Sequence, residues 1–326
     1  MKKKKIMCVT GAIVIIAGLV STYFIEHNYK DNTKAVAKTE SVEKNKESAK
    51  DSKVKLVIDT ENKDTLPKNF RTTGDKIDSE KAGSINLTGL TDLNISGSGA
   101  ISEKSLEAIK EKVGNNPIID VDLRQESHGF INGMGISWFG ENDGANKGLE
   151  RDQVIADEKE KLDKISEDKH ITFDKLAKGK SINTISEIND PESVQSEEEL
   201  AKKVGMNYLR ITATDHERPL DDSVDLFVES VTNLPNGTWL HFHCRGGDGR
   251  TTSFMLMYDM MHNAKKVSFE DIMNRQHLIG GSDLLKGEDK DGTQTRKDFL
   301  NKFYDYCKDN QDNYKTSWSQ WLKDTK

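Results

Sequence analysis

The segment Thr238–Thr252, which reads TWLHFHCRGGDGRTT, constrains the fold of this chain more than any other part of it. Its apolar start predicts a strand, and the three glycines that follow allow a tight turn of the backbone. The next run, TTSFMLMYDMM, is apolar almost all round, which is typical of a buried helix. This order predicts a concave loop whose backbone N–H groups converge on one anion at the start of the helix.

The loop carries the residue types that thiolate-based phosphoryl transfer requires. Cys244 ends the strand and Arg250 follows in a Cys-x5-Arg spacing, so the planar guanidinium can contact two oxygens of a phosphate. We expect the N–H groups and the guanidinium to stabilise the Cys244 thiolate, which is the nucleophilic form. Two other interpretations use the same residues. One is a buried structural cysteine, and the other is zinc at His241, His243 and Cys244, although no second cysteine–histidine cluster completes a tetrahedral site.

Composition limits the partners of the chain. The 326 residues carry a formal net charge of −7, which argues against a general binder of nucleic acid or membrane surfaces. An anionic substrate therefore requires a local basic patch. The three cysteines, Cys8, Cys244 and Cys307, do not form a disulfide framework.

The N-terminal residues have the pattern of an export segment. A lysine cluster at 2–5 precedes residues 6–25, which carry no charge. Residues 1–25 are therefore predicted to be a signal peptide or a signal anchor, and both remain open. We expect an exported protein, either secreted or anchored to the outer face of the membrane by residues 6–25. Residues 26–64 are polar and predict a disordered linker.

Residues 65–326 have globular patterning and predict one catalytic domain. Helix caps at Ser102, Ser196 and Ser268 alternate with apolar runs typical of strands, and this β-α-β-α order predicts an α/β fold with a mostly parallel central sheet flanked by helices. Residues from about 126 to 195 are glycine-rich and then charged, and we interpret them as a small β-rich insertion. The Cys244 loop falls at the carboxyl end of a strand, where such sheets bind ligands.

Several segments resemble one family. HFHCRGGDGRTT and RITATDHERP (Arg210–Pro219) are similar to motifs of the cysteine phytases, bacterial myo-inositol phosphatases with a protein-tyrosine-phosphatase core. The resemblance spans roughly residues 64–326 and continues, in order, through LPKNFRT, ISGSGAIS, DVDLRQESHGFING, SWFGENDGAN, RQHLIGG and YKTSWSQWLK.

The resemblance implies a protein-tyrosine-phosphatase-like fold and a metal-independent phosphatase without a cofactor. Its substrates would be phosphomonoesters of myo-inositol polyphosphates such as phytate, hydrolysed through a phosphocysteine intermediate. Cys244 matches the nucleophile and Arg250 the phosphate-binding arginine of the family. Asp215 matches the general acid, which an inositol alkoxide needs as a poor leaving group. Thr251 would hydrogen-bond Cys244.

The resemblance also implies a set of substrate contacts, for which a solvated surface position is the alternative interpretation. The set comprises His216, the loop residues Arg245, Gly246, Gly247, Asp248 and Gly249, and the outer residues Arg71, Asp143, Arg296 and Lys297. Arg245 favours a polyanion, and Asp248 partly offsets it unless the two residues pair. A protein-tyrosine or phosphoinositide phosphatase with the same loop is the alternative function, because a deep apolar slot suits phosphotyrosine and a wide basic bowl suits an inositol polyphosphate.

Overall fold

The structure is a computed structural model that describes residues 54–140, 143–177, 180–286 and 293–325. One folded unit runs from Lys53 to Lys326. The predicted export segment, residues 1–25, and most of the predicted linker lie outside the described residues. Within the described ranges, no helix has the length and apolar character needed to cross a membrane.

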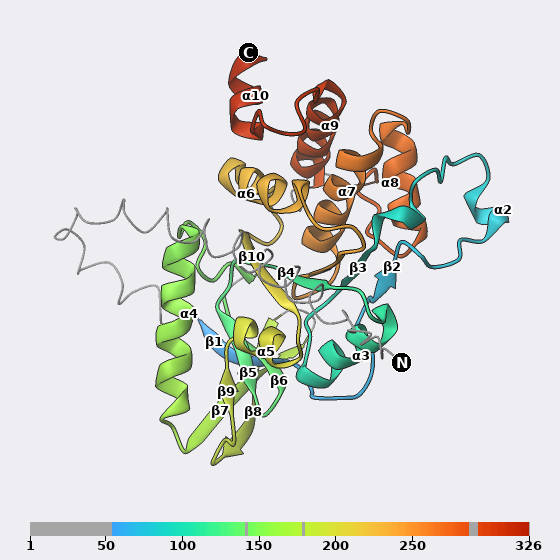
Figure 1. Cartoon of the computed structure of the whole chain (residues 1–326). Coiled ribbons are helices and arrows are strands. Elements are labelled where there is room, and N and C mark those ends of the chain that lie inside the picture. Colours follow the sequence, from blue (N-terminus) through green and yellow to red (C-terminus); the bar gives the residue numbers. More distant parts are fainter. Residues whose placement is uncertain (1–53, 141–142, 178–179, 287–292, 326) are drawn as a thin grey trace, which may run out of the picture. The chain divides into compact units, whose positions relative to one another are not determined.

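The described part of the chain has strands interspersed with helices up to residue 243 and only helices after it (Figure 1). The elements, in chain order, are β1 (Lys55–Thr60), β2 (Arg71–Thr72), α2 (Ser79–Ala82), the 3-10 helix η4 (Thr91–Leu93), β3 (Ile95–Ser98), α3 (Glu103–Val113), β4 (Ile118–Arg124), β5 (His128–Ile131), β6 (Met134–Phe139), α4 (Arg151–Ser166), β7 (His170–Ala177), β8 (Lys180–Asn189), β9 (Val194–Gln195), α5 (Glu197–Lys203), β10 (Asn207–Ala213), α6 (Asp221–Thr232), β11 (Trp239–His243), α7 (Gly249–Asn263), α8 (Phe269–Leu278), α9 (Thr293–Asp309) and α10 (Trp318–Asp324). The predicted caps Ser102, Ser196 and Ser268 each accept a hydrogen bond from the first turn of α3, α5 and α8.

The central sheet has five strands in the order β10-β4-β11-β3-β2. All pairs are parallel except β2 with β3 at one edge. Strand β4 is buried along its whole length, as expected for a strand whose two faces are both covered. The predicted α/β fold with a mostly parallel sheet is therefore confirmed.

Each face of the central sheet has its own apolar core. On one face, Val121, Ile211 and Phe242 pack against helices that include α6 and α7. The other face is covered by α3 and α5 through residues such as Leu106 and Leu200. The Cys244 loop follows β11, a strand in the interior of this sandwich, so rigid elements hold the loop from both sides.

A second sheet of six strands has the order β8-β7-β1-β6-β5-β9. Five of its strands come from residues 126–195, the segment expected to be a small β-rich insertion. The same segment contains the long helix α4, whose Leu162 and Ile165 pack against Ile136 and Phe173 of the sheet. The sequence analysis did not predict a helix in this segment, because the helix has few apolar positions.

The linker prediction was wrong at its C-terminal end. Residues 55–60, which the polar composition assigned to a disordered linker, form β1 inside the second sheet. Val57 is fully buried and pairs with Ser137 of β6 and Asp174 of β7. Three consecutive apolar residues in a polar stretch are a weak local signal, and they form a strand because the second sheet supplies a partner on each side.

We predict that Val57→Ala in the full chain lowers the free energy of unfolding by about 2 kcal/mol, because it removes buried methyl groups and leaves a cavity. Denaturant titration measures this change. Lys55→Ala is the matched control, because the Lys55 side chain is 51% exposed on the same strand. Equal stability of the two variants would contradict a structural role for β1.

Candidate active site

The Cys244 sulfur is enclosed by the loop that follows β11. Cys244 is 2% exposed, and its Sγ accepts hydrogen bonds from the Gly247 N–H at 3.3 Å and from the Thr251 hydroxyl at 3.2 Å. Gly247 has a φ of +78°, and a Cβ there would lie 2.4 Å from the Gly99 nitrogen. Only glycine fits at this position, because the backbone of Ser98 and Gly99 lies directly against it.

Arg250 lies in the first turn of α7 and is held by a buried carboxylate. Its NH1 and NH2 groups donate to the two oxygens of Glu126 at 2.7 and 3.2 Å. Burial by itself lowers the Arg250 pKa, but Glu126, Asp215 and Cys244 together raise it well above its usual range. The guanidinium is therefore permanently charged and oriented beside the sulfur.

Glu126 is the principal site residue that the sequence analysis missed. Burial raises its pKa, but Arg250 and Arg124 outweigh burial and hold it well below the usual range. Glu126 lies in the DVDLRQESHGFING motif, directly after β4, so a carboxylate at the end of a buried strand was the available signal. The pairing of Glu126 with Arg250 could not be predicted from the sequence, because 124 positions separate the two residues.

Asp215 contacts the other edge of the Arg250 guanidinium. Its Oδ1 lies 3.3 Å from the Arg250 Nε, and its side chain is 24% exposed. The exposed His216 follows in the left-handed region with a φ of 61°, and its Nε2 lies 3.4 Å from Asp215 Oδ2. Arg250 thus contacts the predicted acid and interacts electrostatically with the predicted nucleophile.

Asp143 is a second carboxyl group beside Arg250. It is 4% exposed, and its Oδ2 lies 3.4 Å from the Arg250 NH2. Burial and repulsion from Glu126 raise the Asp143 pKa to about 7, against the attraction of Arg250. This carboxyl group therefore keeps its proton to a higher pH than an ordinary aspartate, which limits the negative charge next to the loop.

Arg245 belongs to a ladder of alternating charges that ends at Arg250. Its Nε donates to Asp59 of β1 at 2.7 Å, and its guanidinium lies 4.8 Å from the centre of the Phe139 ring. Arg124 then bridges Asp59 and Glu126 at 2.8 and 2.7 Å. Each of the two carboxylates, Asp59 and Glu126, therefore lies between two arginines.

The remaining predicted contacts lie around the loop in different ways. Arg245 and Asp248 do not pair with each other. Asp248 is exposed and accepts from Asn69, which also donates to the Gly246 carbonyl at 2.9 Å. Arg296 is 5% exposed and lies against Gly249, where an added Cβ would be 2.9 Å from the Arg296 NH1. Lys297 is the half-buried neighbour of Arg296 on α9, and Arg71 lies buried behind the loop.

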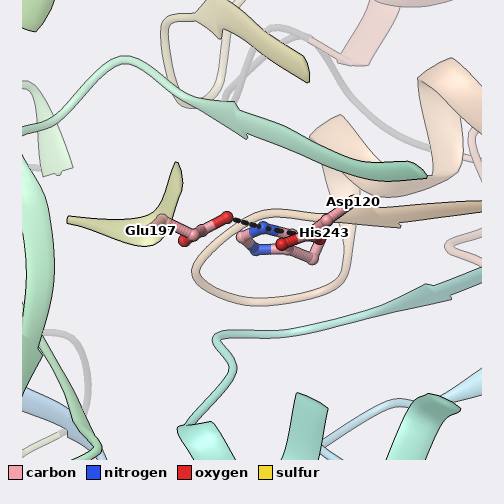
Figure 2. Close-up of side chains that lie close together, drawn as sticks. All are labelled: Asp120, Glu197 and His243. Atoms are coloured by element: carbon pink, nitrogen blue, oxygen red, sulfur yellow. Dashed lines mark hydrogen bonds and ion pairs between the residues drawn. The ribbon is translucent and has the colours of Figure 1, made fainter. Parts of the chain in front are cut away.

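Below the loop, a buried cluster of acids and histidines joins β4, β11 and α5. Figure 2 shows the Glu197 carboxylate turned toward the His243 ring, with Asp120 beside it. The Glu197 Oε1 lies 2.6 Å from the His243 Nε2, and its Oε2 lies 3.0 Å from the His128 Nε2. In the described ranges, two groups lie close enough to share one metal ion: Asp120, Glu197 and His243, and Asp122, His128 and Glu197.

At neutral pH the His128 and His243 imidazoles of this cluster are protonated, which does not suit a metal ion. Burial by itself lowers the pKa of both imidazoles, but the carboxylates prevail and raise the His128 pKa to about 10 and the His243 pKa to about 9. Protonated imidazole has no lone pair to offer a metal. Burial and repulsion from Glu197 raise the Asp120 pKa well above its usual range, which keeps this carboxyl neutral and balances the cluster.

A Cys-x5-Arg loop between a central parallel strand and a buried helix defines a protein-tyrosine-phosphatase-like fold. The comparisons with known proteins agree. A model of the PTP-like phytase family matches residues 121–262, and the description of this family names inositol hexakisphosphate. A PTP-like phytase from Bdellovibrio bacteriovorus superposes with a TM-score of 0.65 at 34% identity, over 82% of this chain and 94% of that one. The chain therefore belongs to the PTP-like phytase family.

Two further relatives are longer than this chain. The PTP-like myo-inositol phosphatase from Mitsuokella multacida, solved in complex with myo-inositol-(1,3,4,5)-tetrakisphosphate, has a TM-score of 0.79 at 40% identity, over 84% of this chain. The effector protein hopD2 of Pseudomonas syringae pathovar tomato is 32% identical over 77% of this chain. This chain covers only 48% of the first and 56% of the second.

The histidine cluster predicts how stability depends on pH. Both imidazole pKa values are raised by folding, so their stabilisation is complete below about pH 6.5 and is lost as the pH rises through about 9 and about 10. We expect the free energy of unfolding to fall by about 1 kcal/mol per pH unit for each imidazole above about pH 7. Denaturant titrations between about pH 6 and about pH 10 measure this slope.

His128→Gln should be less stable at neutral pH and should show a shallower slope, because one of the two titrating imidazoles is gone. His170→Gln is the control, because His170 is 52% exposed and lies away from the cluster. A slope in the His128 variant that equals the wild-type slope would exclude His128 as a source of the pH dependence.

Proposed function

We propose that the protein is an exported, metal-independent phosphatase that hydrolyses phosphomonoesters of myo-inositol polyphosphates through a phosphocysteine intermediate. The single observation that carries the proposal is the Cys244 sulfur, which accepts from the Gly247 N–H and the Thr251 hydroxyl next to the buried Arg250. Membership of the PTP-like phytase family supports the substrate class.

The first step is attack by the Cys244 thiolate on phosphorus. The loop N–H groups and the Arg250 fork hold the phosphoryl oxygens, and the bond from phosphorus to the ester oxygen breaks as the sulfur–phosphorus bond forms. Asp215, which lies 3.3 Å from the Arg250 Nε, gives its proton to the departing inositol oxygen.

The second step returns the enzyme to its starting state. Asp215, now ionised, takes a proton from water as the water oxygen attacks phosphorus, and the sulfur–phosphorus bond breaks to release phosphate. The Thr251 hydroxyl, 3.2 Å from the sulfur, stabilises Cys244 as it departs as a thiolate. The cycle uses the residues of this chain and water alone.

The charge distribution around the loop supports a polyanionic substrate. The Arg245 Nε contacts Asp59, and the Arg245 side chain is 21% exposed, so this cation is accessible at the edge of the loop. Arg296 adds a second guanidinium at Gly249. A relative that binds an inositol tetrakisphosphate is consistent with this pattern. A phosphotyrosine or phosphoinositide phosphatase is the second candidate, because the Cys-x5-Arg loop serves all three substrate classes.

Export rests on the N-terminal pattern of a lysine cluster followed by uncharged residues 6–25. A relative named as a bacterial effector protein is in line with secretion. We propose that the N-terminal segment directs export and makes the only membrane contact of the chain.

Cys244→Ser should abolish phosphate release from inositol hexakisphosphate while the protein stays folded, because the hydroxyl is a far weaker nucleophile than the thiolate. Phosphate release measures the effect, and circular dichroism checks the fold. Cys307→Ser is the matched control, since Cys307 is buried in α9 away from the loop. Substantial activity of the Cys244 variant would contradict the mechanism.

The same assay separates the candidate substrates. The wild type should release phosphate from inositol hexakisphosphate at a higher kcat/KM than from a phosphotyrosine peptide or a phosphoinositide head group, with or without a chelator. A preference for the peptide would favour the second candidate.

Asp215→Asn should slow turnover of inositol hexakisphosphate by roughly 100-fold or more, because the alkoxide leaving group needs a proton. Turnover of p-nitrophenyl phosphate should fall much less, since nitrophenolate leaves without protonation. Steady-state kinetics on both substrates measure the difference. The control Asp222→Asn changes an exposed carboxylate at the start of α6 and should leave both rates unchanged. Equal losses on the two substrates would remove Asp215 from the role of acid.

A further inference from the structure

Arg71 of β2 donates hydrogen bonds to the Cys244 loop and to the residues beside it. It is 2% exposed, and its NH1 donates to the Gly247 carbonyl at 2.8 Å and to the Asn69 carbonyl at 3.0 Å. Its NH2 donates to the Thr252 hydroxyl at 3.1 Å. Gly247 thus offers its carbonyl to Arg71 and its N–H to the Cys244 sulfur, so one residue connects the guanidinium to the nucleophile.

All of these acceptors are uncharged. Across the described ranges, no carboxylate lies within 4.0 Å of the Arg71 guanidinium, and its buried Nε has no hydrogen-bond partner there. The other fully buried arginines each bind a carboxylate. These are Arg124 with Asp59, Arg210 with Glu158, Arg250 with Glu126 and Arg275 with Asp259. A buried cation without a nearby anion is costly, so Arg71 requires a counter-charge.

A thiolate at Cys244 would supply this charge from the same loop, because Gly247 links the sulfur to the Arg71 guanidinium. Burial lowers the Arg71 pKa, while Cys244 and Asp248 are the anions that act to raise it. Asp248 is exposed to water, which screens its charge, whereas Cys244 is buried on the same loop. Cys244 is therefore the effective partner of Arg71.

The other charges around Cys244 are already balanced. Arg250 of α7 faces three carboxyl groups, those of Glu126, Asp143 and Asp215. On β11, His243 is bound to Glu197. Burial holds the pKa of the neighbouring His241 well below its usual range, so that ring is neutral. Arg71 is thus a buried positive charge near the loop that has no carboxylate within 4.0 Å in the described part of the chain.

We infer that Arg71 is a positioning residue that fixes the rear of the phosphate loop and holds Cys244 in its thiolate form, and that it is not a contact for substrate. This revises the sequence-based expectation that Arg71 lines the substrate pocket. The inference rests on the proposed function only in taking Cys244 as the nucleophile, so it stands whichever phosphoester is hydrolysed.

Alkylation of Cys244 by iodoacetamide tests the inference without any phosphoester. The rate is followed by peptide mass spectrometry from about pH 5 to about pH 9 on the full chain, because only the thiolate reacts. Arg71→Gln and Arg71→Met should alkylate roughly tenfold more slowly at acidic pH, since loss of a nearby charge shifts the thiolate equilibrium by about one pH unit. Arg71→Lys, which keeps the charge, should stay within about threefold of the wild type.

The matched control is Arg275→Gln, which removes a buried arginine that has its own carboxylate partner. This variant should lose stability but keep the wild-type alkylation profile. The methionine variant fills the buried volume without a polar group, so it remains informative where glutamine impairs folding. Wild-type alkylation rates in the folded glutamine or methionine variant would overturn the inference. So would equal slowing in the lysine and glutamine variants, or a rise in KM for phosphoester with alkylation unchanged.

Discussion

The bidentate pair between Arg250 and Glu126 is the interaction on which the arrangement of the active site depends. Glu126 lies between the last residue of β4 and the first residue of β5, where the chain leaves the central sheet and enters the second one. Both side chains are fully buried, so their charges are stable only as long as each has the other. The pair thereby fixes the Arg250 guanidinium at the point where the two sheets meet.

Charged groups continue along the junction between the sheets. Arg210 of β10 binds Glu158 of α4, and His128 of β5 binds Glu197 of α5. Elsewhere the elements pack through apolar clusters, each of which belongs mainly to one face of one sheet. Oppositely charged groups need defined distances and directions, whereas apolar side chains tolerate small shifts. The polar junction therefore sets the position of the second sheet against the loop more sharply than an apolar contact would.

This arrangement is what the proposed combination of a thiolate and a polyanion site on one loop rests on. Arg250 contacts three carboxyl groups, and the ladder through Arg124 and Asp59 connects it to the partly exposed Arg245. Arg71 contacts the loop through the Gly247 carbonyl, and among the described residues no carboxylate lies within 4.0 Å of it. Arg250, Arg245 and Arg71 therefore make different contacts around the loop: with Glu126, with Asp59 and with the Gly247 carbonyl.

Local patterns in the sequence determined the strand, the glycine-rich loop and the helix around Cys244, the capped helices and the parallel order of the central sheet. These features depend on residues close together in the chain, where periodicity and glycine are direct signals. The tertiary structure alone decided the role of β1, the partner of Arg250 and the place of Arg71. Arg245 and Asp59 are 186 positions apart, and Arg71 and Gly247 are 176 apart. Such pairs form because folding brings buried charges together, and no local pattern specifies which distant partner a charge will meet.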